Sequence, residues 1–167
     1  IPMVPVAVLH WRCENPAEEL PHGFGFLVPR VEGVRVLGTL FPSQLFGDRA
    51  PVGSHLLASF YGGALDREAY EMDDESLTEL MRAEHEAAFG VKLQGLRVLR
   101  IVRHPYAIPQ LIPEHPTTVA KLRHAITAIP GLSLAGNYLT GVGIEQAVES
   151  GYLAGTEVQE FLGGAKS

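Results

Sequence analysis

The stretch that is most informative about the fold lies near the C-terminus: Leu132-Ser133-Leu134-Ala135-Gly136-Asn137-Tyr138-Leu139-Thr140-Gly141-Val142-Gly143-Ile144. Residues 132–135 predict a short buried strand, and the glycines that follow predict a turn. From Ile144 to Val158, apolar and small residues recur at helical spacing, which predicts a long helix with one buried face. The first amide groups of such a helix have no helical acceptor, so the sequence predicts a possible anion site at this turn.

Spacing alone leaves two interpretations of this turn. In the first, Gly141 and Gly143 keep side chains away from the backbone, so that a ligand can approach it closely. In the second, the glycines serve only the geometry of the turn. The segment does not match the dinucleotide fingerprint G-x-G-x-x-G, and the fingerprint occurs nowhere else in the chain.

The rest of the chain predicts strands first and helices later, which favours an α+β fold. We expect strands at 4–10, 24–28, 35–40, 55–61 and 96–103, and helices at 74–89 and 116–128. We expect 104–110 to be a loop, because Pro105 and Pro109 exclude a helix interior. We therefore predict a first domain at 1–103 and a second at 104–167.

Composition excludes several classes of protein. The 167 residues carry a net charge of −6, which argues against a nucleic-acid partner, and no apolar run approaches the roughly 20 residues of a spanning helix. The only cysteine, Cys13, excludes an internal disulfide and favours a reducing, cytoplasmic compartment. No histidine pair has metal-ligand spacing, so we predict no metal site.

Negative charge is concentrated between residues 66 and 86, which hold nine acids and two bases. Asp73 or Asp74 can cap the helix expected there, and Gly90 suits its C-terminal end. The acidic face is either simply solvated or a docking face for a basic partner. After it, Arg100 and Arg103 either reach an anionic ligand, pair with the acidic helix or are simply surface charges.

Four segments together resemble the C-terminal part of protoporphyrinogen oxidases, which belong to the amine oxidase and phytoene desaturase superfamily. The first is the turn from Leu134 to Ile144, continued by Ser150-Gly151, which is similar to a flavin-binding signature. The others are Gly23-Phe24-Gly25-Phe26-Leu27-Val28-Pro29, the run from Leu37 to Pro51, and Ala107-Ile108-Pro109-Gln110. The resemblance covers about residues 4 to 160.

The resemblance implies an FAD-dependent enzyme of heme biosynthesis that oxidises a porphyrinogen to a porphyrin and passes the electrons to dioxygen. The first domain would then be part of a mixed-sheet substrate domain, and the strand, turn and helix at the C-terminus part of a Rossmann-like FAD-binding domain. It implies cofactor contacts at Ala135, Gly136, Asn137, Gly141, Val142, Gly143 and Ile144, with His104 near the flavin. It implies an apolar substrate wall at Phe24, Gly25, Leu27 and Phe60. No catalytic side chain is implied.

Two departures from the family pattern matter. His104 stands where the family often has Trp, and the chain lacks the N-terminal G-x-G-x-x-G unit that holds the adenosine diphosphate. Since the chain opens with Ile1-Pro2-Met3 on a strand-like run, we expect a fragment of a longer protein, inactive by itself, whose missing FAD-binding part is its partner. Peripheral membrane contact of the whole protein stays open. The alternatives are another flavoenzyme of the superfamily, an amine oxidase or a carotenoid desaturase, or a non-catalytic truncated domain.

Overall fold

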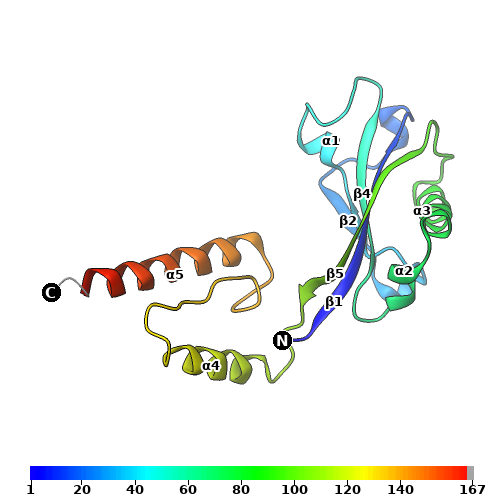
Figure 1. The fold of residues 1–167 in the computed structure, drawn as a ribbon. Coiled ribbons are helices and arrows are strands. Elements are labelled where there is room, and N and C mark those ends of the chain that lie inside the picture. The colour runs from blue at the N-terminus through cyan, green and yellow to red at the C-terminus, as the bar shows by residue number, and fades with distance from the viewer. Residues whose placement is uncertain (165–167) are drawn as a thin grey trace. The chain divides into compact units, whose positions relative to one another are not determined.

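A computed structural model describes residues 1–164, which form two compact units (Figure 1). One unit comprises Val4–Ala107. The other comprises residues 1–3 together with the described part of the chain from Ile108 onward. The boundary between the two units thus lies near residue 107, whereas the predicted domain boundary lies at 103/104. That assignment of functional domains stays a prediction.

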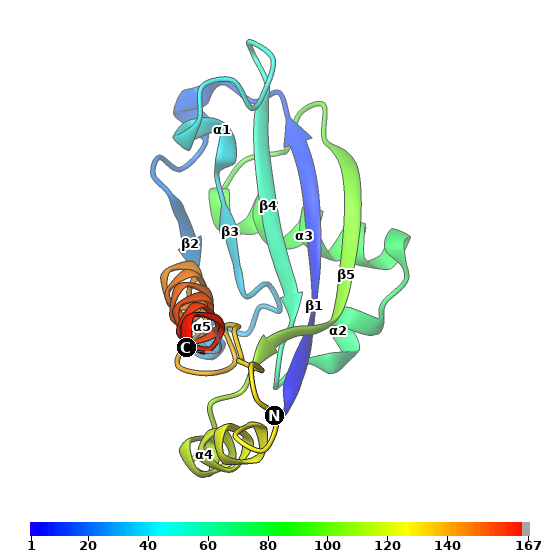
Figure 2. The same cartoon turned by 60° about the vertical axis from the view of Figure 1, so that its left-hand side comes forward.

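The Val4–Ala107 unit is built on a five-stranded sheet with the order β2-β3-β4-β1-β5 (Figures 1 and 2). The pairs β2–β3, β3–β4 and β4–β1 are antiparallel. The strands are β1 (Met3–Cys13), β2 (Gly25–Leu27), β3 (Gly38–Leu40), β4 (His55–Gly62) and β5 (Arg97–Pro109). The mixture of helices with an antiparallel sheet agrees with the predicted α+β class.

Seven helical segments accompany the sheet in the described chain. They are η1 (Ala17–Glu19), η2 (Arg30–Glu32), α1 (Pro42–Leu45), α2 (Arg67–Glu71), α3 (Asp74–Phe89), α4 (His115–Ile126) and α5 (Ile144–Gly164). The acidic helix α3 has the predicted bounds. The Asp73 side chain accepts a hydrogen bond from the Ser76 amide, and Gly90 ends the helix with φ 71°.

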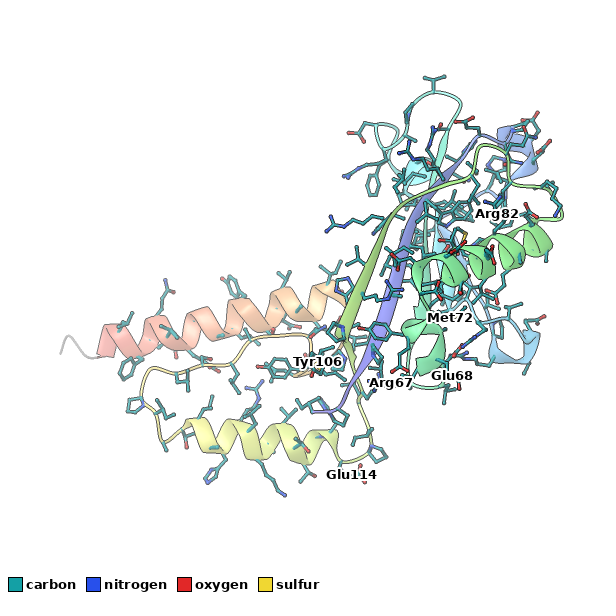
Figure 3. The ribbon with its side chains drawn as sticks, turned by 45° about the vertical axis from the view of Figure 1, so that its right-hand side comes forward. Arg67, Glu68, Met72, Arg82, Tyr106 and Glu114 are labelled. Carbon is teal, nitrogen blue, oxygen red and sulfur yellow. The ribbon has the colours of Figure 1, made fainter. Side chains whose placement is uncertain are left out.

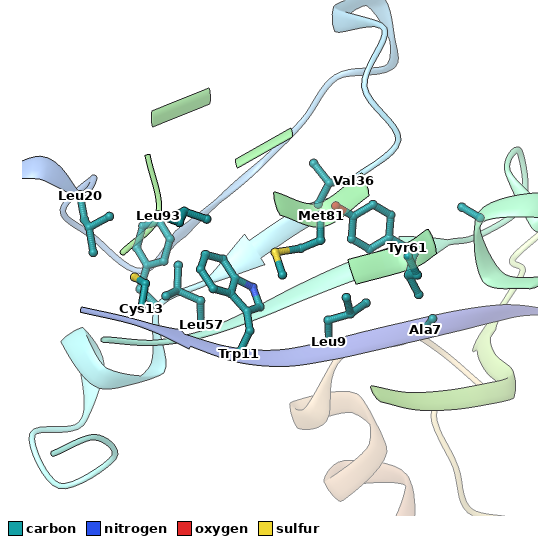
Figure 4. Packing of buried hydrophobic residues seen from close by; sticks show 13 residues of the cluster. Ala7, Leu9, Trp11, Cys13, Leu20, Val36, Leu57, Tyr61, Met81 and Leu93 are labelled. Atoms are coloured by element: carbon teal, nitrogen blue, oxygen red, sulfur yellow. The ribbon is translucent and has the colours of Figure 1, made fainter. Parts of the chain in front are cut away.

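The core of this unit lies between one face of the sheet and α3 (Figure 4). Leu9 and Trp11 of β1 and Tyr61 of β4 are fully buried there, and α3 contributes Leu77 and Met81. Leu77 and Met81 lie one helical turn apart, so both point to the same side of α3. This one side of the helix packs against residues from several strands.

A polar network within this core joins α3 to three strands. The Trp11 indole donates to Ser59 Oγ at 2.9 Å, and the Thr39 and Ser59 hydroxyls lie 2.7 and 3.0 Å from His85 Nε2. His85 Nδ1 lies 2.7 Å from the Met81 carbonyl, which can only accept, so Nδ1 carries the proton and Nε2 is the acceptor. Burial lowers the pKa of His85 to about 4, so the ring is neutral near neutral pH.

Three predicted elements differ from the structure. The strand expected at 35–40 is shortened to Gly38–Leu40, because the amides of Arg35 and Val36 donate to the Glu84 carboxylate, at 2.6 and 3.0 Å, instead of to a strand. The strand expected at 24–28 is likewise reduced to Gly25–Leu27. The loop expected at 104–110 is wrong for residues 104–109, which belong to β5. Since β5 lies at the edge of the sheet, its prolines interrupt no ladder on its outer side.

The short buried strand expected at 132–135 is also wrong. These residues have no regular structure, and Leu132 is 47 % exposed. A strand requires a neighbour to satisfy its backbone groups, and no strand of the described residues pairs with this segment. The helix after it does begin at Ile144, as predicted.

Candidate functional site

The sheet presents a second face, turned away from α3, and three of the predicted substrate-wall residues lie on it. Phe26, Thr39, Ser59 and Leu9 form one row across the sheet on the α3 side. Because successive side chains point to opposite faces, the residues on either side of this row belong to the second face.

Strand register aligns this second face in two neighbouring rows. The first row runs Leu27, Gly38, Phe60, Val8, and the second runs Gly25, Leu40, Ala58, His10. Seven of the eight residues are apolar or glycine. The face therefore offers an apolar surface, against which a flat ring system can lie.

The glycines of β2 and β3 are required by the close approach of the two backbones. Gly25 has φ 151°, and a Cβ there would collide with the Thr39 carbonyl oxygen. A Cβ on Gly38 would come within 2.5 Å of the Phe26 carbonyl oxygen. The Leu27 side chain lies over Gly38, where a Cβ would also come within 2.8 Å of Leu27 Cδ2. Glycine at this position therefore lets Leu27 pack onto the sheet.

The predicted wall residues thus separate into two groups. Gly25, Leu27 and Phe60 share the second face, where Leu27 is 87 % exposed and Phe60 partly buried. Phe24, 65 % exposed, precedes β2 and falls in neither row. Leu40, which sequence reasoning did not select, occupies the second row between Gly25 and Ala58. The alternation Gly38-Thr39-Leu40 was the available signal, but only the register shows which neighbours Leu40 has.

The turn before α5 is held by a serine within the helix. Ser150 Oγ accepts a hydrogen bond from the Gly136 amide at 2.9 Å and donates to the Ala147 carbonyl at 2.8 Å. Gly136 has φ 146°, a conformation that favours glycine, whereas Gly141 and Gly143 have no positive φ. Ser150 is buried. The sequence indicated it only as part of the flavin-binding signature, and the structure shows that its side chain holds the turn.

The N-terminus of α5 is accessible within its unit. Val142 and Ile144 are 50 % and 85 % exposed, Gly143 is exposed, and Asn137 is partly buried. The helix begins with the bond from the Ala147 amide to the Gly143 carbonyl, so the amides just before Ala147 have no acceptor within the helix. The Gln146 side chain lies against Gly141 and Gly143, so a ligand that reaches this backbone would have to displace it. Amides at a helix N-terminus suit the pyrimidine or phosphate oxygens of a flavin nucleotide.

A cavity of about 370 Å³ lies beside this part of α5. Its lining includes Leu134, Thr140 and Ser150, together with the acids Glu149, Glu157 and Glu160 of α5. None of the predicted cofactor residues between Ala135 and Ile144 lines it. The cavity is therefore a feature of the side of α5, and the predicted cofactor contacts at the turn stay a prediction.

His104 belongs to β5 in the other unit, and its side chain is exposed. The loop that was expected to carry it over the flavin is a strand. The position of His104 near the cofactor stays a prediction.

Comparison with known proteins assigns the family. A family model described as flavin containing amine oxidoreductase matches residues 1–159, nearly the whole chain. The chain belongs to this family. It is 37 % identical over 143 residues to the chloroplastic protoporphyrinogen oxidase of Nicotiana tabacum and 32 % identical over 142 residues to the coproporphyrinogen III oxidase of Mycobacterium bovis. These alignments cover 84 % and 85 % of this chain.

This member of the flavin containing amine oxidoreductases spans only part of its relatives. It covers 26 % of the tobacco protein and 30 % of the mycobacterial one. A solved structure from Exiguobacterium, provisionally named a protoporphyrinogen oxidase, superposes with a TM-score of 0.75 at 21 % identity. That superposition covers 95 % of this chain and 34 % of the other, and it shows that the fold is shared.

Two further classes of feature are absent from residues 1–164 of this chain. Nowhere in this part of the chain do three or more metal-ligating side chains gather in one place. Its helices are also too short or too polar to cross a membrane.

Proposed function

We propose that this chain forms the C-terminal part of an FAD-dependent oxidase that converts a porphyrinogen to a porphyrin, with dioxygen as the electron acceptor, in porphyrin and heme biosynthesis. The observation that carries the proposal is the pair of apolar rows on the second face, which includes three wall residues expected from sequence alone. A large, flat and mostly apolar macrocycle suits such a face better than a small polar amine does.

FAD, when bound, would accept hydride equivalents from the porphyrinogen and return them to dioxygen. The chain's own residues would bind the flavin and the porphyrinogen and orient them. The α5 amides and the turn fixed by Ser150 would hold the electron-poor end of the flavin and stabilise negative charge there. Leu27, Leu40 and Phe60 would hold the macrocycle and exclude water from its reacting carbon atoms.

The proposal also includes a partner for the chain. The two relatives are about three times as long as this chain, and the G-x-G-x-x-G unit expected for the adenosine diphosphate is not among these 167 residues. We propose that such a nucleotide-binding part works together with this chain. The proposed location is a reducing, cytoplasmic compartment.

Leu27→Ala tests the proposed wall in the flavin-loaded protein. Leu27 is so exposed that its truncation should leave folding intact, while the lost apolar contact with substrate, about 1 kcal/mol, should raise KM about fivefold. Val31→Ala is the matched control, because Val31 is 90 % exposed and lies on η2, outside both rows. The rate is followed by porphyrin fluorescence. Equal KM values for both variants and the wild type would contradict the proposed wall.

A second substrate is favoured by one finding, the 32 % identity to a coproporphyrinogen III oxidase. Parallel assays with protoporphyrinogen and coproporphyrinogen separate the two. The substrate with the higher kcat/KM is the physiological class, and oxidation of neither, with flavin bound, would refute the proposed activity.

A further inference from the structure

The two apolar rows end at a polar edge on β1. His10 closes the second row, and it faces away from α3 because its neighbours Leu9 and Trp11 are both fully buried in the core. The next strand after β1 is β5, which forms the edge of the sheet. The side chains of β5 near His10 therefore determine the chemistry at this border of the second face.

Arg100 of β5 is a cation at this border. Ile101 packs against the core and Arg103 pairs with Asp74 of α3, so the alternation of side chains along β5 turns Arg100 to the second face. The Arg100 side chain is exposed, and its charge acts on His10: burial first, and then the positive charge of Arg100, lower the pKa of His10. His10 is therefore neutral near neutral pH and keeps one ring N–H as a hydrogen-bond donor.

Arg100 and Arg97 of β5 both lack a carboxylate partner among the described residues, and of these two only Arg100 acts on the pKa of His10. Two other arginines nearby are paired. Arg103, three residues further on, pairs with Asp74 at 2.5 Å and donates to the Met72 carbonyl. Arg12 of β1 pairs with Glu14 at 3.0 Å. Among residues 1–164, no acid forms an ion pair with Arg100. A guanidinium beside an apolar surface, with its donors free, is a suitable partner for an oxygen anion on a ligand.

We propose that Arg100 and His10 bind a carboxylate of the substrate at the border of the second face. This inference rests on the proposed function, since a porphyrinogen combines an apolar macrocycle with propionate side chains. The macrocycle would lie over the two rows, and a propionate would reach the Arg100 guanidinium, with the His10 N–H as a second donor. Arg100 would then select substrates by their carboxylates without taking part in the redox step.

The test compares Arg100→Gln with the wild type in the flavin-loaded protein, using one porphyrinogen and its methyl ester. The ester keeps the macrocycle but carries no negative charge. For the acid we expect KM to rise about tenfold with kcat within about twofold, and for the ester we expect no change, because a paired charge is lost only in the first case. Arg100→Lys, which keeps the charge but not the planar fork, should restore part of the affinity.

Arg82→Gln is the matched control. Arg82 lies on α3, on the other side of the sheet (Figure 3), so its substitution removes the same charge from the same unit but not from the second face. It should leave both KM values unchanged. Thermal unfolding by circular dichroism checks that each variant is folded, as expected for exposed residues.

The possible failures are distinguishable. If wild-type protein with bound flavin oxidises neither acid nor ester, the proposed function is refuted and this inference falls with it. If the wild type is active but Arg100→Gln leaves KM for the acid unchanged, only the carboxylate site is refuted. An equal rise in KM for acid and ester would also refute it, because the effect would then not depend on the substrate's charge.

Discussion

The buried imidazole of His85 makes the Val4–Ala107 unit sensitive to acid. In the folded unit Nε2 is the hydrogen-bond acceptor for the hydroxyl pair of Thr39 and Ser59, which lie 2.7 and 3.0 Å from it, and burial lowers the pKa of the ring from 6.5 to about 4. A proton on Nε2 would replace this acceptor by a donor inside the core. The unfolded chain takes up that proton near its ordinary pKa, so acid favours the unfolded state.

The size and direction of the effect follow from the two pKa values. Above about pH 7.5 the ring is neutral in both states, and the full contribution to stability is present. As the pH falls below about 6.5, the unfolded chain binds the proton while the folded unit does not, and by about pH 5 the free energy of unfolding should drop by about 2 kcal/mol. The loss should approach about 3 kcal/mol near pH 4, where the folded unit itself begins to be protonated.

Urea unfolding followed by Trp11 fluorescence measures this effect. Trp11 is the only tryptophan of the chain, and its ring centroid lies 5.0 Å from that of His85, so the signal reports this unit. His85→Gln removes the titrating group, and His22→Gln, at an exposed position of the same unit, is the control. Between about pH 7.5 and about pH 5, the wild type and the control should lose about 2 kcal/mol more than His85→Gln does. The same pH slope in all three proteins would refute the reasoning.

Three other substitutions address separate parts of the chain. Glu84→Ala leaves the amides of Arg35 and Val36 and the Tyr61 hydroxyl without their acceptor. It should therefore lower the free energy of unfolding by about 3 kcal/mol. Glu79→Ala, at an exposed position of the same helix, should lower it by less than about 0.5 kcal/mol in the same urea assay. Gly143→Val places a branched side chain at the start of α5 and should reduce bound flavin per protein, with circular dichroism unchanged; full flavin content would contradict the cofactor assignment. His104→Ala should shift the flavin reduction potential or FAD affinity by about 1 kcal/mol and leave turnover intact, and a loss of turnover by orders of magnitude with flavin bound would reveal a direct chemical function.

Local signals in the sequence were sufficient for the helices that carry their own boundaries. Asp73, Gly90 and the spacing of Leu77 and Met81 predicted α3 from Asp74 to Phe89, and the structure agrees. The start of α5 at Ile144 was predicted in the same way. Capping and helical periodicity act between residues a few positions apart, so they can be read without the rest of the fold.

The candidate site could be predicted only in part, because its residues come from segments that are far apart in the sequence. Leu27 and Phe60 were selected by resemblance, but their common row, and the place of Leu40 beside them, depend on the register between strands that are distant in sequence. The pairing of Arg103 with Asp74, which leaves Arg100 without that acidic partner, is also a contact between distant segments.

The sequence by itself determined the α+β class, the family resemblance, the bounds of α3, the start of α5 and the glycine-rich turn before it. The helix expected at 116–128 forms from His115 to Ile126, and α1 and α2 were not predicted. Only the tertiary structure decided that 104–109 extends an edge strand, that 132–135 is no strand among the described residues, and which side chains share the second face. The physical reason is that a strand has no hydrogen-bond partner within itself. Its existence, its register and the face to which each side chain points are set by neighbouring strands, whereas an α-helix satisfies its own backbone.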